Sequence, residues 1–442
     1  MSADVPRVLV LAHRFPPSGG AGVQRNLQLA RHLEEAGWHP VIVTGPGPVE
    51  YRWTPEDPDL AGEGFRADVI RIQGPEPTPG VWETRFERWL RTPTRWRRWW
   101  REGVLRASAS VREVGVVHAS VAPYATASAA VAAARRLRKP LVLDLEDPWA
   151  LDEMLVYPTG AHRRLELRRM GHALRSADAV VMNTAEARAR VLAAFPDLDP
   201  ARVYAIPNAF DPRDFARPVT PRLGGRFRIV HTGSLHTELG LRHRAEARRR
   251  RLLGGAVEGV DFLTRSHVVI LEALEALLGD RPELAGRVEM VLAGVFTDGD
   301  RAEAARHSCA RLLDFVPHAA TIELVRSADL LFLPMQDLPE GRRAGLVPHK
   351  TYEYLASGRP ILAAVPDGDA RDLLAAAGSA HLCRPGDVAA MRAILAEEIG
   401  RWEAGAAASG PDPSVVRRCR SERLVQDLVR VYEDLAGPAS GR

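Results

Sequence analysis

Residues 7–25 read RVLVLAHRFPPSGGAGVQR: an apolar run, then a loop rich in proline and glycine, then the start of a helix. The apolar run Arg7–Ala12 has the composition of a buried strand. The helix that follows carries on one face Val23, Leu27, Ala30 and Leu33. A strand, a glycine loop and an amphipathic helix in this order begin a βαβ unit, which predicts an α/β fold with a parallel sheet.

The same alternation of apolar runs and helical segments continues almost to the end of the chain. In the first half it predicts strands at Arg7–Ala12, His39–Thr44, Asp68–Ile72, Val114–Ala119, Pro140–Leu145, Ala179–Asn183 and Val203–Pro207. In the second half it predicts strands at Phe227–Thr232, Arg287–Ala293, Leu312–Val316, Asp329–Pro334, Pro360–Val365 and Ala380–Cys383. Helices are predicted at Ser266–Leu278, His349–Ser357 and Ser421–Leu435. This is the pattern of two Rossmann-like halves, in which ligands bind outside the carboxyl ends of the strands.

Composition excludes several classes of protein. A chain of 442 residues with 46% hydrophobic and 26% charged residues is typical of a soluble globular protein with two or three domains. The net charge of +4 does not by itself indicate a nucleic-acid binder. Three widely spaced cysteines argue against a disulfide framework and against a zinc site. Because no signal peptide or membrane span is evident, we expect a cytoplasmic protein.

The first loop, His13–Arg25, has glycines that let the backbone approach an anion at a helix N-terminus. It nearly spells the dinucleotide fingerprint, but Arg25 stands where the last glycine is required. The second strand ends at Thr44-Gly45 and not at the acidic residue that holds a ribose. A nicotinamide cofactor is therefore disfavoured, and a plain tight turn is the alternative to an anion site.

Two loops of the second half carry the same kind of signal. Residues 231–235 read HTGSL, so Gly233 and Ser234 can present backbone N–H groups to a phosphate. Residues 348–360 read PHKTYEYLASGRP and place Lys350, one of two lysines in the chain, at the start of a helix. Glu353, one turn further, can accept hydrogen bonds from a ribose. The alternative is a solvated amphipathic helix with Tyr352 in the core.

Together these loops resemble the retaining, nucleotide-sugar-dependent glycosyltransferases of family 4. Further matching segments are VLDLEDPW at 142–149, VYAIPNAF at 203–210 and the strand Asp329–Pro334, and the set occurs in the order of the family. The resemblance implies an α/β GT-B fold, with two Rossmann-like domains whose parallel sheets face a central cleft. It places an acceptor-binding domain at 1–207, a linker at 208–226 and a nucleotide-sugar-binding domain at 227–415. A last helix, within 416–442, is expected to pack back on the first domain.

The resemblance also assigns residues to roles. The implied catalytic residues are His118, Lys350 and Arg265. The implied donor-binding residues are Gly19, Gly20, Gly233, Ser234, Lys350, Thr351, Tyr352 and Glu353. The implied acceptor-binding residues are Asp147, Ser120 and Arg25. No cofactor and no metal are expected beside the nucleotide sugar, because fixed cations can stabilise the departing diphosphate. We therefore interpret the Asp-x-Asp stretches at 57–59, 298–300 and 367–369 as turns.

The chain departs from the family at three places. Gly345 stands where the family has the first glutamate of a pair, and Glu340 is a candidate substitute. The arginine-rich stretch 236–264 forms an insertion, after which Arg265 fits the phosphate-binding arginine, with Arg242 and Arg244 as alternatives. Glu146 stands where relatives often carry arginine, which leaves the acceptor chemistry open.

The stretch Arg85–Arg106 interleaves tryptophans with eight arginines. This composition suits an anionic membrane surface, which would make the protein peripheral on the inner face of the membrane and favour a lipid-linked acceptor. The alternative is tryptophan in the core with arginine outside, and no nucleic-acid motif accompanies the stretch.

We expect a metal-independent hexosyltransferase acting in polysaccharide biosynthesis on a glycan, lipid-linked or small-molecule acceptor. Two alternatives are a nucleotide-sugar epimerase of the same fold and a catalytically inactive scaffold protein.

Overall fold

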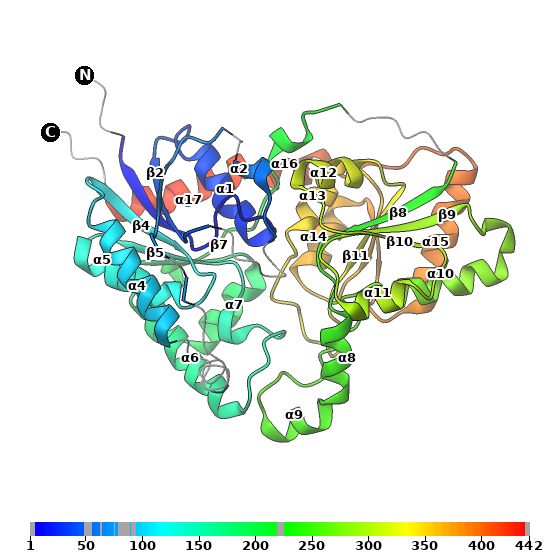
Figure 1. Cartoon of the computed structure of the whole chain (residues 1–442), viewed down its shortest axis with the longest axis horizontal. Coiled ribbons are helices and arrows are strands. Elements are labelled where there is room, and N and C mark those ends of the chain that lie inside the picture. Colours follow the sequence, from blue (N-terminus) through cyan, green and yellow to red (C-terminus); the bar gives the residue numbers. More distant parts are fainter. Residues whose placement is uncertain are drawn as a thin grey trace. The chain divides into compact units, whose positions relative to one another are not determined.

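The computed structural model describes residues 5–47, 55–61, 64–74, 76–77, 89, 94–218 and 225–437. The chain divides into two compact units. Unit 1 comprises 1–208, 253–256 and 421–442, and unit 2 comprises 209–252 and 257–420. Each unit is a parallel sheet flanked by helices (Figure 1).

The sheet of unit 1 has the strand order β3-β2-β1-β4-β5-β6-β7, and every pairing is parallel. The strands are β1 (Arg7–Leu11), β2 (His39–Thr44), β3 (Asp68–Arg71), β4 (Val114–Ser120), β5 (Leu141–Leu145), β6 (Ala179–Met182) and β7 (Val203–Ala205). The order reverses between β1 and β4, which is where doubly wound sheets bind ligands. The loops after β1 and β4 therefore start next to each other, at the carboxyl edge of the sheet.

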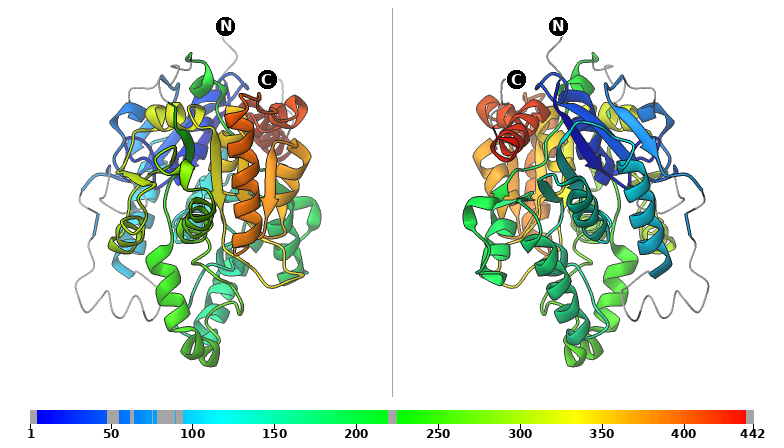
Figure 2. Two further views of the ribbon diagram at one scale, coloured as in Figure 1. Left: turned by 90° about the vertical axis from the view of Figure 1, so that its right-hand side faces the viewer. Right: turned by 90° about the vertical axis from the view of Figure 1, so that its left-hand side faces the viewer.

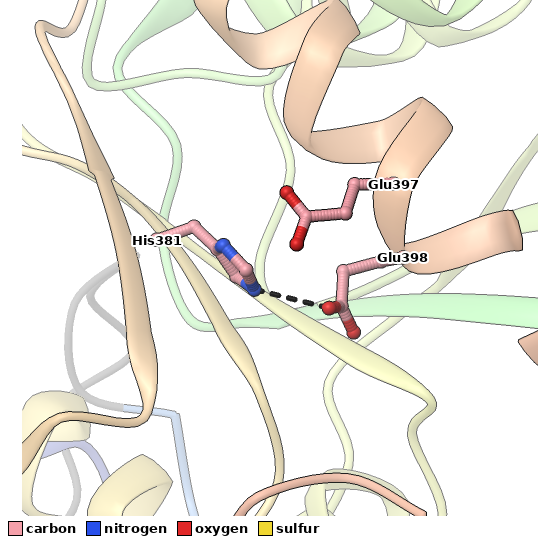
Figure 3. Close-up of side chains that lie close together, drawn as sticks. All are labelled: His381, Glu397 and Glu398. Carbon is pink, nitrogen blue, oxygen red and sulfur yellow. Dashed lines mark hydrogen bonds and ion pairs between the residues drawn. The ribbon is translucent and has the colours of Figure 1, made fainter. Parts of the chain in front are cut away.

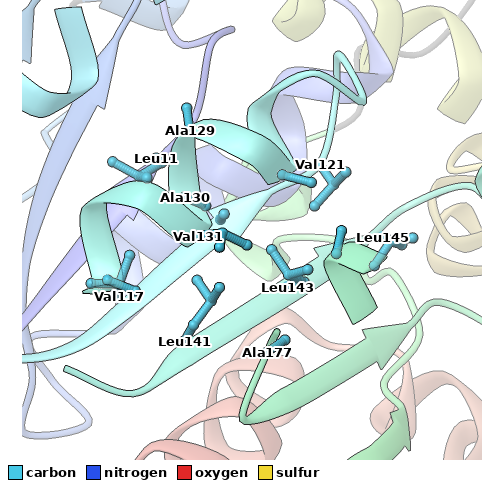
Figure 4. Close-up of a cluster of buried hydrophobic side chains, with 14 of the residues drawn as sticks. Leu11, Val117, Val121, Ala129, Ala130, Val131, Leu141, Leu143, Leu145 and Ala177 are labelled. Atoms are coloured by element: carbon cyan, nitrogen blue, oxygen red, sulfur yellow. The ribbon is translucent and has the colours of Figure 1, made fainter. Parts of the chain in front are cut away.

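The helices of unit 1 are α1 (Ala21–His32), α2 (Pro58–Ala61), α4 (Thr94–Ser108), α5 (Thr126–Leu137), α6 (Gly160–Arg175), α7 (Ala185–Ala194) and α17 (Ser421–Ala436), with short 3-10 turns η1 (Trp149–Leu151) and η2 (Pro200–Arg202). Helix α17 contacts α1 and β4, and α4 packs along α5. Figure 4 shows part of the core around α5, in which the small side chains of Ala129 and Ala130 belong to the same buried cluster as Val117 and Leu143. Small residues on this face let the helix lie close to the strands, which builds a dense core.

The sheet of unit 2 has the strand order β10-β9-β8-β11-β12-β13 and is also wholly parallel. The strands are β8 (Phe227–Thr232), β9 (Val288–Ala293), β10 (Ala310–Leu313), β11 (Leu330–Pro334), β12 (Ile361–Ala364) and β13 (Ala380–Cys383). Here the order reverses between β8 and β11. The HTGSL stretch follows β8, and the loop that leads to Lys350 follows β11.

The helices of unit 2 are α8 (Thr237–Ala245), α9 (Ala247–Leu253), α10 (Val268–Asp280), α11 (Asp298–Ala304), α12 (His318–Arg326), α13 (Lys350–Ser357), α14 (Asp369–Ala377), α15 (Val388–Glu403) and α16 (Pro413–Arg418), with 3-10 turns η3 (Pro212–Phe215) and η4 (Pro282–Leu284). Figure 2 shows α15 lying along the strands, and its buried residues join those of α10 in the core of this unit.

Every predicted strand is present, most of them within a residue or two of the expected bounds. The largest shift concerns β10, which we predicted at Leu312–Val316 and which lies at Ala310–Leu313. Pairing with β9 sets this register, because Ala310 lies opposite Met290 and Leu313 opposite Ala293. The arginine-rich stretch 236–264 contains α8 and α9. Among the described helices, none is both long and apolar enough to cross a membrane.

Candidate functional site

The N-terminus of α13 is fixed at the carboxyl edge of the unit 2 sheet by a buried tyrosine. The hydroxyl of Tyr354 accepts a hydrogen bond from the backbone N–H of Thr232, at 2.9 Å. This contact joins α13 to the end of β8 and brings two loops together that are more than a hundred residues apart in sequence. Lys350 and the HTGSL stretch therefore meet, as the fold predicts.

Lys350 lies directly against Gly233. A Cβ atom on Gly233 would lie 2.9 Å from Nζ of Lys350, and Gly233 also has a φ of +102°. A side chain here would be strained at this φ and would displace the ammonium group from its present position. The glycine of HTGSL thus makes room for the lysine.

His231 determines how the lysine is held. Its Nδ1 lies 3.0 Å from the carbonyl oxygen of Phe332, which can only accept, so Nδ1 carries the proton. Its Nε2 lies 3.3 Å from Nζ of Lys350 and accepts a hydrogen bond from the amine. Burial and the charge of Lys350 hold the pKa of His231 well below its ordinary value, so the ring is neutral.

The site concentrates positive charge. Burial lowers the pKa of Lys350 to about 7, and the nearby charge of Arg265 lowers it further than Glu353 can restore. The guanidinium of Arg265 donates to Gln336 at 3.3 Å. Arg242 of α8 pairs with Glu238, and Arg244 of α8 pairs with Asp261. Because the charge of Arg265 lowers the pKa of Lys350, Arg265 stays the arginine for which we propose the phosphate-binding role.

Glu353 lies one turn along α13 and is 9% exposed. Burial by itself raises the pKa of Glu353, but the contact with His349, together with His318 and Lys350, outweighs burial and holds the pKa below its ordinary value. Nδ1 of His349 lies 3.5 Å from the carboxylate. The carboxylate is therefore ionised and able to accept hydrogen bonds from hydroxyl groups.

Two polar atoms of this region are buried without a hydrogen-bond partner among the described residues: Oγ1 of Thr351 and Nε2 of His349. Unpaired polar atoms are costly in a fold unless a ligand or water satisfies them. Tyr352 is buried with 2% exposure and packs near His349, so its predicted donor-binding role rests on its backbone. Ser234 is partly exposed beside Gly233.

Sequence reasoning missed three histidines of this site: His231, His349 and His318. His318 begins α12, and its Nε2 lies 3.0 Å from Asp214. Only His349 gave a signal, because it directly precedes Lys350. His231 and His318 gave no such signal, because their places near Lys350 and Glu353 depend on how β8, β11 and α12 pack together.

Unit 1 brings its predicted residues together in a buried polar network, in which Oδ1 of Asp144 and Nε2 of His118 lack a hydrogen-bond partner among the described residues. Nε of Arg25 donates to Asp144 at 2.7 Å, and the other guanidinium nitrogens donate to Asn208 and to the carbonyl oxygens of Pro207 and Ile206. Arg25 is 1% exposed. We predicted Arg25 to bind the acceptor, but this burial favours a positioning role in which it joins α1, β5 and the end of the first unit.

His118 is fully buried in β4. Its Nδ1 lies 2.9 Å from the hydroxyl of Tyr432 on α17, and its Nε2 lies 3.5 Å from Asp144. Burial lowers the pKa of His118 to about 4, since Asp144 offsets only part of this cost and Arg25 adds to it. His118 is thus neutral and enclosed, which favours a supporting role over direct contact with a sugar.

Glu146 lies just after β5 and reaches toward the end of β4. Its Oε1 accepts a hydrogen bond from Ser120 at 3.3 Å, and Ser120 in turn accepts one from Asn26 of α1 at 3.4 Å. Burial raises the pKa of Glu146 to about 8, and the carboxylates of Asp147 and Asp144 act in the same direction against Arg25. Glu146 is therefore largely protonated at neutral pH. Asp147, predicted to bind the acceptor, is exposed beside it.

Gly19 and Gly20 form the turn before α1. A Cβ atom on Gly19 would lie 3.0 Å from Cβ of Asp57, and the Gly19 N–H donates to the carbonyl of Pro55 at 2.7 Å. Gly20 has a φ of +92° at the start of α1. These contacts explain both glycines as a tight turn, and their predicted role toward the diphosphate stays a prediction.

Among the described residues, one group of three possible metal ligands comes together: His381 on β13 with Glu397 and Glu398 on α15 (Figure 3). The hydrogen bond to Glu398, 3.1 Å long, raises the pKa of His381. Arg401 also lies 3.6 Å from Glu398. Two cationic partners balance this carboxylate, so we interpret the group as an ion-pair network.

In the Asp-x-Asp stretch at 298–300, Asp300 caps α11 together with Thr297.

The fold and these loops define the class of the chain. Its fold is GT-B, and it is similar over its whole length to solved structures of that class. HepE from Anabaena, solved with UDP and glucose, is 16% identical, covers 97% of this chain and 100% of its own, and has a TM-score of 0.62. A glycosyltransferase from Rickettsia africae is 14% identical, with 99% and 100% covered and a TM-score of 0.61. Sucrose-phosphate synthase from Thermosynechococcus elongatus is 15% identical, with 98% and 96% covered and a TM-score of 0.56.

Within this class, residues 19–214 match the sequence model of Glycosyltransferase Family 4. The match supports the resemblance that the motifs indicate: over these residues, the chain is similar to glycosyltransferase family 4. No sequence among the curated proteins matches it.

Proposed function

We propose that the chain is a retaining glycosyltransferase that moves a sugar, of the hexose type, from a nucleoside-diphosphate sugar to an acceptor, without a metal ion. The observation that carries the proposal is the position of Lys350 at the start of α13, where its Nζ lies against Gly233 and His231 and the charge of Arg265 helps to lower its pKa. Two like charges placed together at a partly buried site are costly, and an anion between them would remove that cost. A diphosphate fits this requirement.

The proposed reaction breaks the bond between the anomeric carbon and the oxygen of the β-phosphate. The electron pair of that bond stays on the departing diphosphate, while an acceptor hydroxyl oxygen forms the new glycosidic bond and gives its proton to an oxygen of that diphosphate. Negative charge grows on the β-phosphate as the bond breaks, so Lys350 and Arg265 would stabilise the transition state more than the ground state. Glu353 would hold the ribose hydroxyls. Retention of configuration is proposed from the family resemblance alone.

Solved structures of similar fold support the choice of donor. HepE has been solved in complex with UDP-glucose as well as with UDP and glucose. We therefore propose a uridine nucleotide as the first donor to test. We propose that the acceptor is a glycan, a lipid-linked sugar or a small molecule and that the reaction belongs to polysaccharide biosynthesis. The proposed location is the cytoplasm or the membrane surface.

Calorimetry with UDP and UDP-glucose tests the proposal, followed by an assay for release of UDP. The protein should bind both ligands, and Lys350→Ala and Glu353→Ala should each lower turnover at least a hundredfold while thermal melting stays cooperative. If no nucleoside diphosphate binds, the proposal is contradicted. If the protein keeps its function in both Lys350→Ala and Glu353→Ala, a scaffold role is favoured over an enzyme.

A second candidate is an epimerase. A protein from Listeria monocytogenes named as a UDP-N-acetylglucosamine 2-epimerase has a similar fold, with 14% identity, 97% and 96% covered and a TM-score of 0.55. An epimerase interconverts the nucleotide sugar without an acceptor, so incubation with the donor alone should yield a new epimer. A transferase should show no such product and should need an acceptor for rapid release of UDP.

A further inference from the structure

Unit 1 contains a cavity of about 720 Å³ between helices α4, α5 and α6. Its cationic side chains are Arg97, Arg101, Arg135, Arg136, Arg168 and Arg169. None of the described residues that line it is acidic. The volume lies within the range of pockets that bind small molecules. The cavity is therefore large enough for a ligand, and its charge selects an anion.

Among the described residues, Glu166 is the acidic side chain that pairs with one of these arginines, Arg169. Burial lowers the pKa of Arg97, the charge of Arg169 lowers it further, and Glu166 offsets only part of the effect. Glu166 is already shared, because it pairs with Arg169 and accepts a hydrogen bond from the indole of Trp149. Nε of Arg97 is buried without a hydrogen-bond partner among the described residues. Two guanidinium groups competing for one carboxylate make a site that an anion would complete.

The floor of the same cavity is apolar. It includes Leu105 of α4, Val131 and Ala132 of α5, and the ring of Trp149, which stacks on Tyr124 at 5.1 Å with the planes nearly parallel. A small hydrophilic anion would leave this floor in contact with water. A ligand with an apolar part would cover the floor and gain the free energy of removing apolar surface from water.

From the cationic rim and the apolar floor we infer that this cavity binds a lipid with a phosphate headgroup, the phosphate held by the arginines and the first part of the hydrocarbon chain lying on the floor. The inference rests on the proposed function and narrows its acceptor to a phosphate-linked lipid. Trp149 of the floor lies two residues after Asp147, so the cavity borders the predicted acceptor loop along the chain.

The orientation of α4 decides which side chains meet the lipid. Trp100 is fully buried, and Trp96 and Trp99 pack partly buried against the same core. For this part of Arg85–Arg106 the structure favours the core interpretation of the tryptophans. Residues 85–88 and 90–93 lie outside the described residues. The arginines of α4, and not its tryptophans, are the groups that face the proposed ligand.

The test uses the purified full chain and farnesyl phosphate below its critical micelle concentration. Calorimetry should detect binding that weakens as salt is raised. Farnesol and inorganic phosphate, which each offer half of the recognised chemistry, should bind at least tenfold more weakly. Equal affinity for inorganic phosphate would reduce the site to a simple anion site and overturn the inference, as would the absence of farnesyl phosphate binding.

Two variants locate the ligand. Arg97→Gln combined with Arg168→Gln removes two charges and keeps the Glu166–Arg169 pair, and should weaken binding at least tenfold. Ala132→Trp fills the floor from a partly exposed position and should block the hydrocarbon chain. The matched control, Arg248→Gln with Arg249→Gln on α9, removes the same charge from exposed positions of unit 2 and should bind as the wild type does. If both cavity variants fold and bind normally, the cavity is not the site.

A parallel titration with UDP-glucose separates this inference from the proposed function. Binding of UDP-glucose without farnesyl phosphate would overturn the lipid site alone. Binding of farnesyl phosphate without any nucleotide would support the lipid site and contradict the glycosyltransferase proposal.

Discussion

Both units have polar residues at the carboxyl edge of a parallel sheet, but the buried cations at the two edges differ in their partners. In unit 1, Arg25 is paired with Asp144 and surrounded by further acceptors, so its charge is fully compensated. In unit 2, Lys350 meets a neutral histidine and the charge of Arg265. A compensated charge holds a fold together, whereas a buried cation beside a second cation favours the binding of an anion. Four predictions test this contrast.

The largest effect is expected on breaking the ion pair between Arg25 and Asp144. Arg25→Met leaves Asp144 buried without its partner, so the free energy of unfolding should fall by about 3–5 kcal/mol. Chemical denaturation followed by circular dichroism measures this change. Arg112→Met, an exposed arginine of the same unit, is the control and should change stability by no more than about 0.5 kcal/mol. A loss below about 1 kcal/mol for Arg25→Met would mean that the network does not support the fold.

At Lys350 we expect a mutation to change the free energy of unfolding in the opposite direction. Lys350→Met keeps the length of the side chain and removes a charge that burial and Arg265 disfavour. The ligand-free protein should therefore become more stable by about 1–3 kcal/mol, while binding of UDP-glucose is lost. Thermal melting and calorimetry give the two readouts.

Lys139→Met is the matched control for this change, since Lys139 is the only other lysine and is exposed. It should alter neither stability nor binding. A Lys350→Met protein that is less stable than the wild type would show that the lysine supports the fold, and would remove the contrast between the two units.

Glu146 gives a smaller effect that depends on pH. Its pKa is raised from 4.5 to about 8, so the native state keeps a proton that the unfolded chain loses across this range. The free energy of unfolding should fall as pH rises from 4.5 to 8, and the loss should be complete above pH 8. Glu146→Gln, which stays neutral, should be more stable than the wild type by about 1–2 kcal/mol at pH 8.5, after allowance for partial exposure.

The difference between the Glu146→Gln and wild-type proteins should disappear near pH 4.5, where both side chains are neutral. Denaturant melts at the two pH values measure it. Glu102→Gln, at an exposed position of α4, should show no such dependence. Equal stability of wild type and Glu146→Gln at pH 8.5 would mean that the carboxylate is solvated and ionised at neutral pH.

The sequence predicts one of these two regions better than the other. Periodicity and glycine positions predict the strands of both sheets, and the spacing of Lys350, Glu353 and Gly233 predicts the loops that meet in unit 2. These signals are local, because each loop follows its strand directly. Local sequence equally marked His118 and Arg25 as site residues, for catalysis and for acceptor binding. In the structure both side chains are buried. Their enclosure depends on Tyr432 and Asn208, which come from distant segments that no local pattern relates to them.

The pH dependence of donor binding is the smallest expected effect and the most direct test of the site at Lys350. Because the pKa of Lys350 is about 7 in the free protein, about half of the molecules carry the charge at pH 7 and about a tenth at pH 8. A bound diphosphate favours the protonated amine, so binding takes up a proton and the affinity for UDP-glucose should fall about fivefold between pH 7 and 8, or about 1 kcal/mol. UDP-glucose is the suitable probe because its diphosphate diester does not titrate in this range. In Lys350→Arg the guanidinium stays charged, so calorimetry should find an affinity independent of pH, whereas the same pH dependence in both proteins would place the titrating group elsewhere.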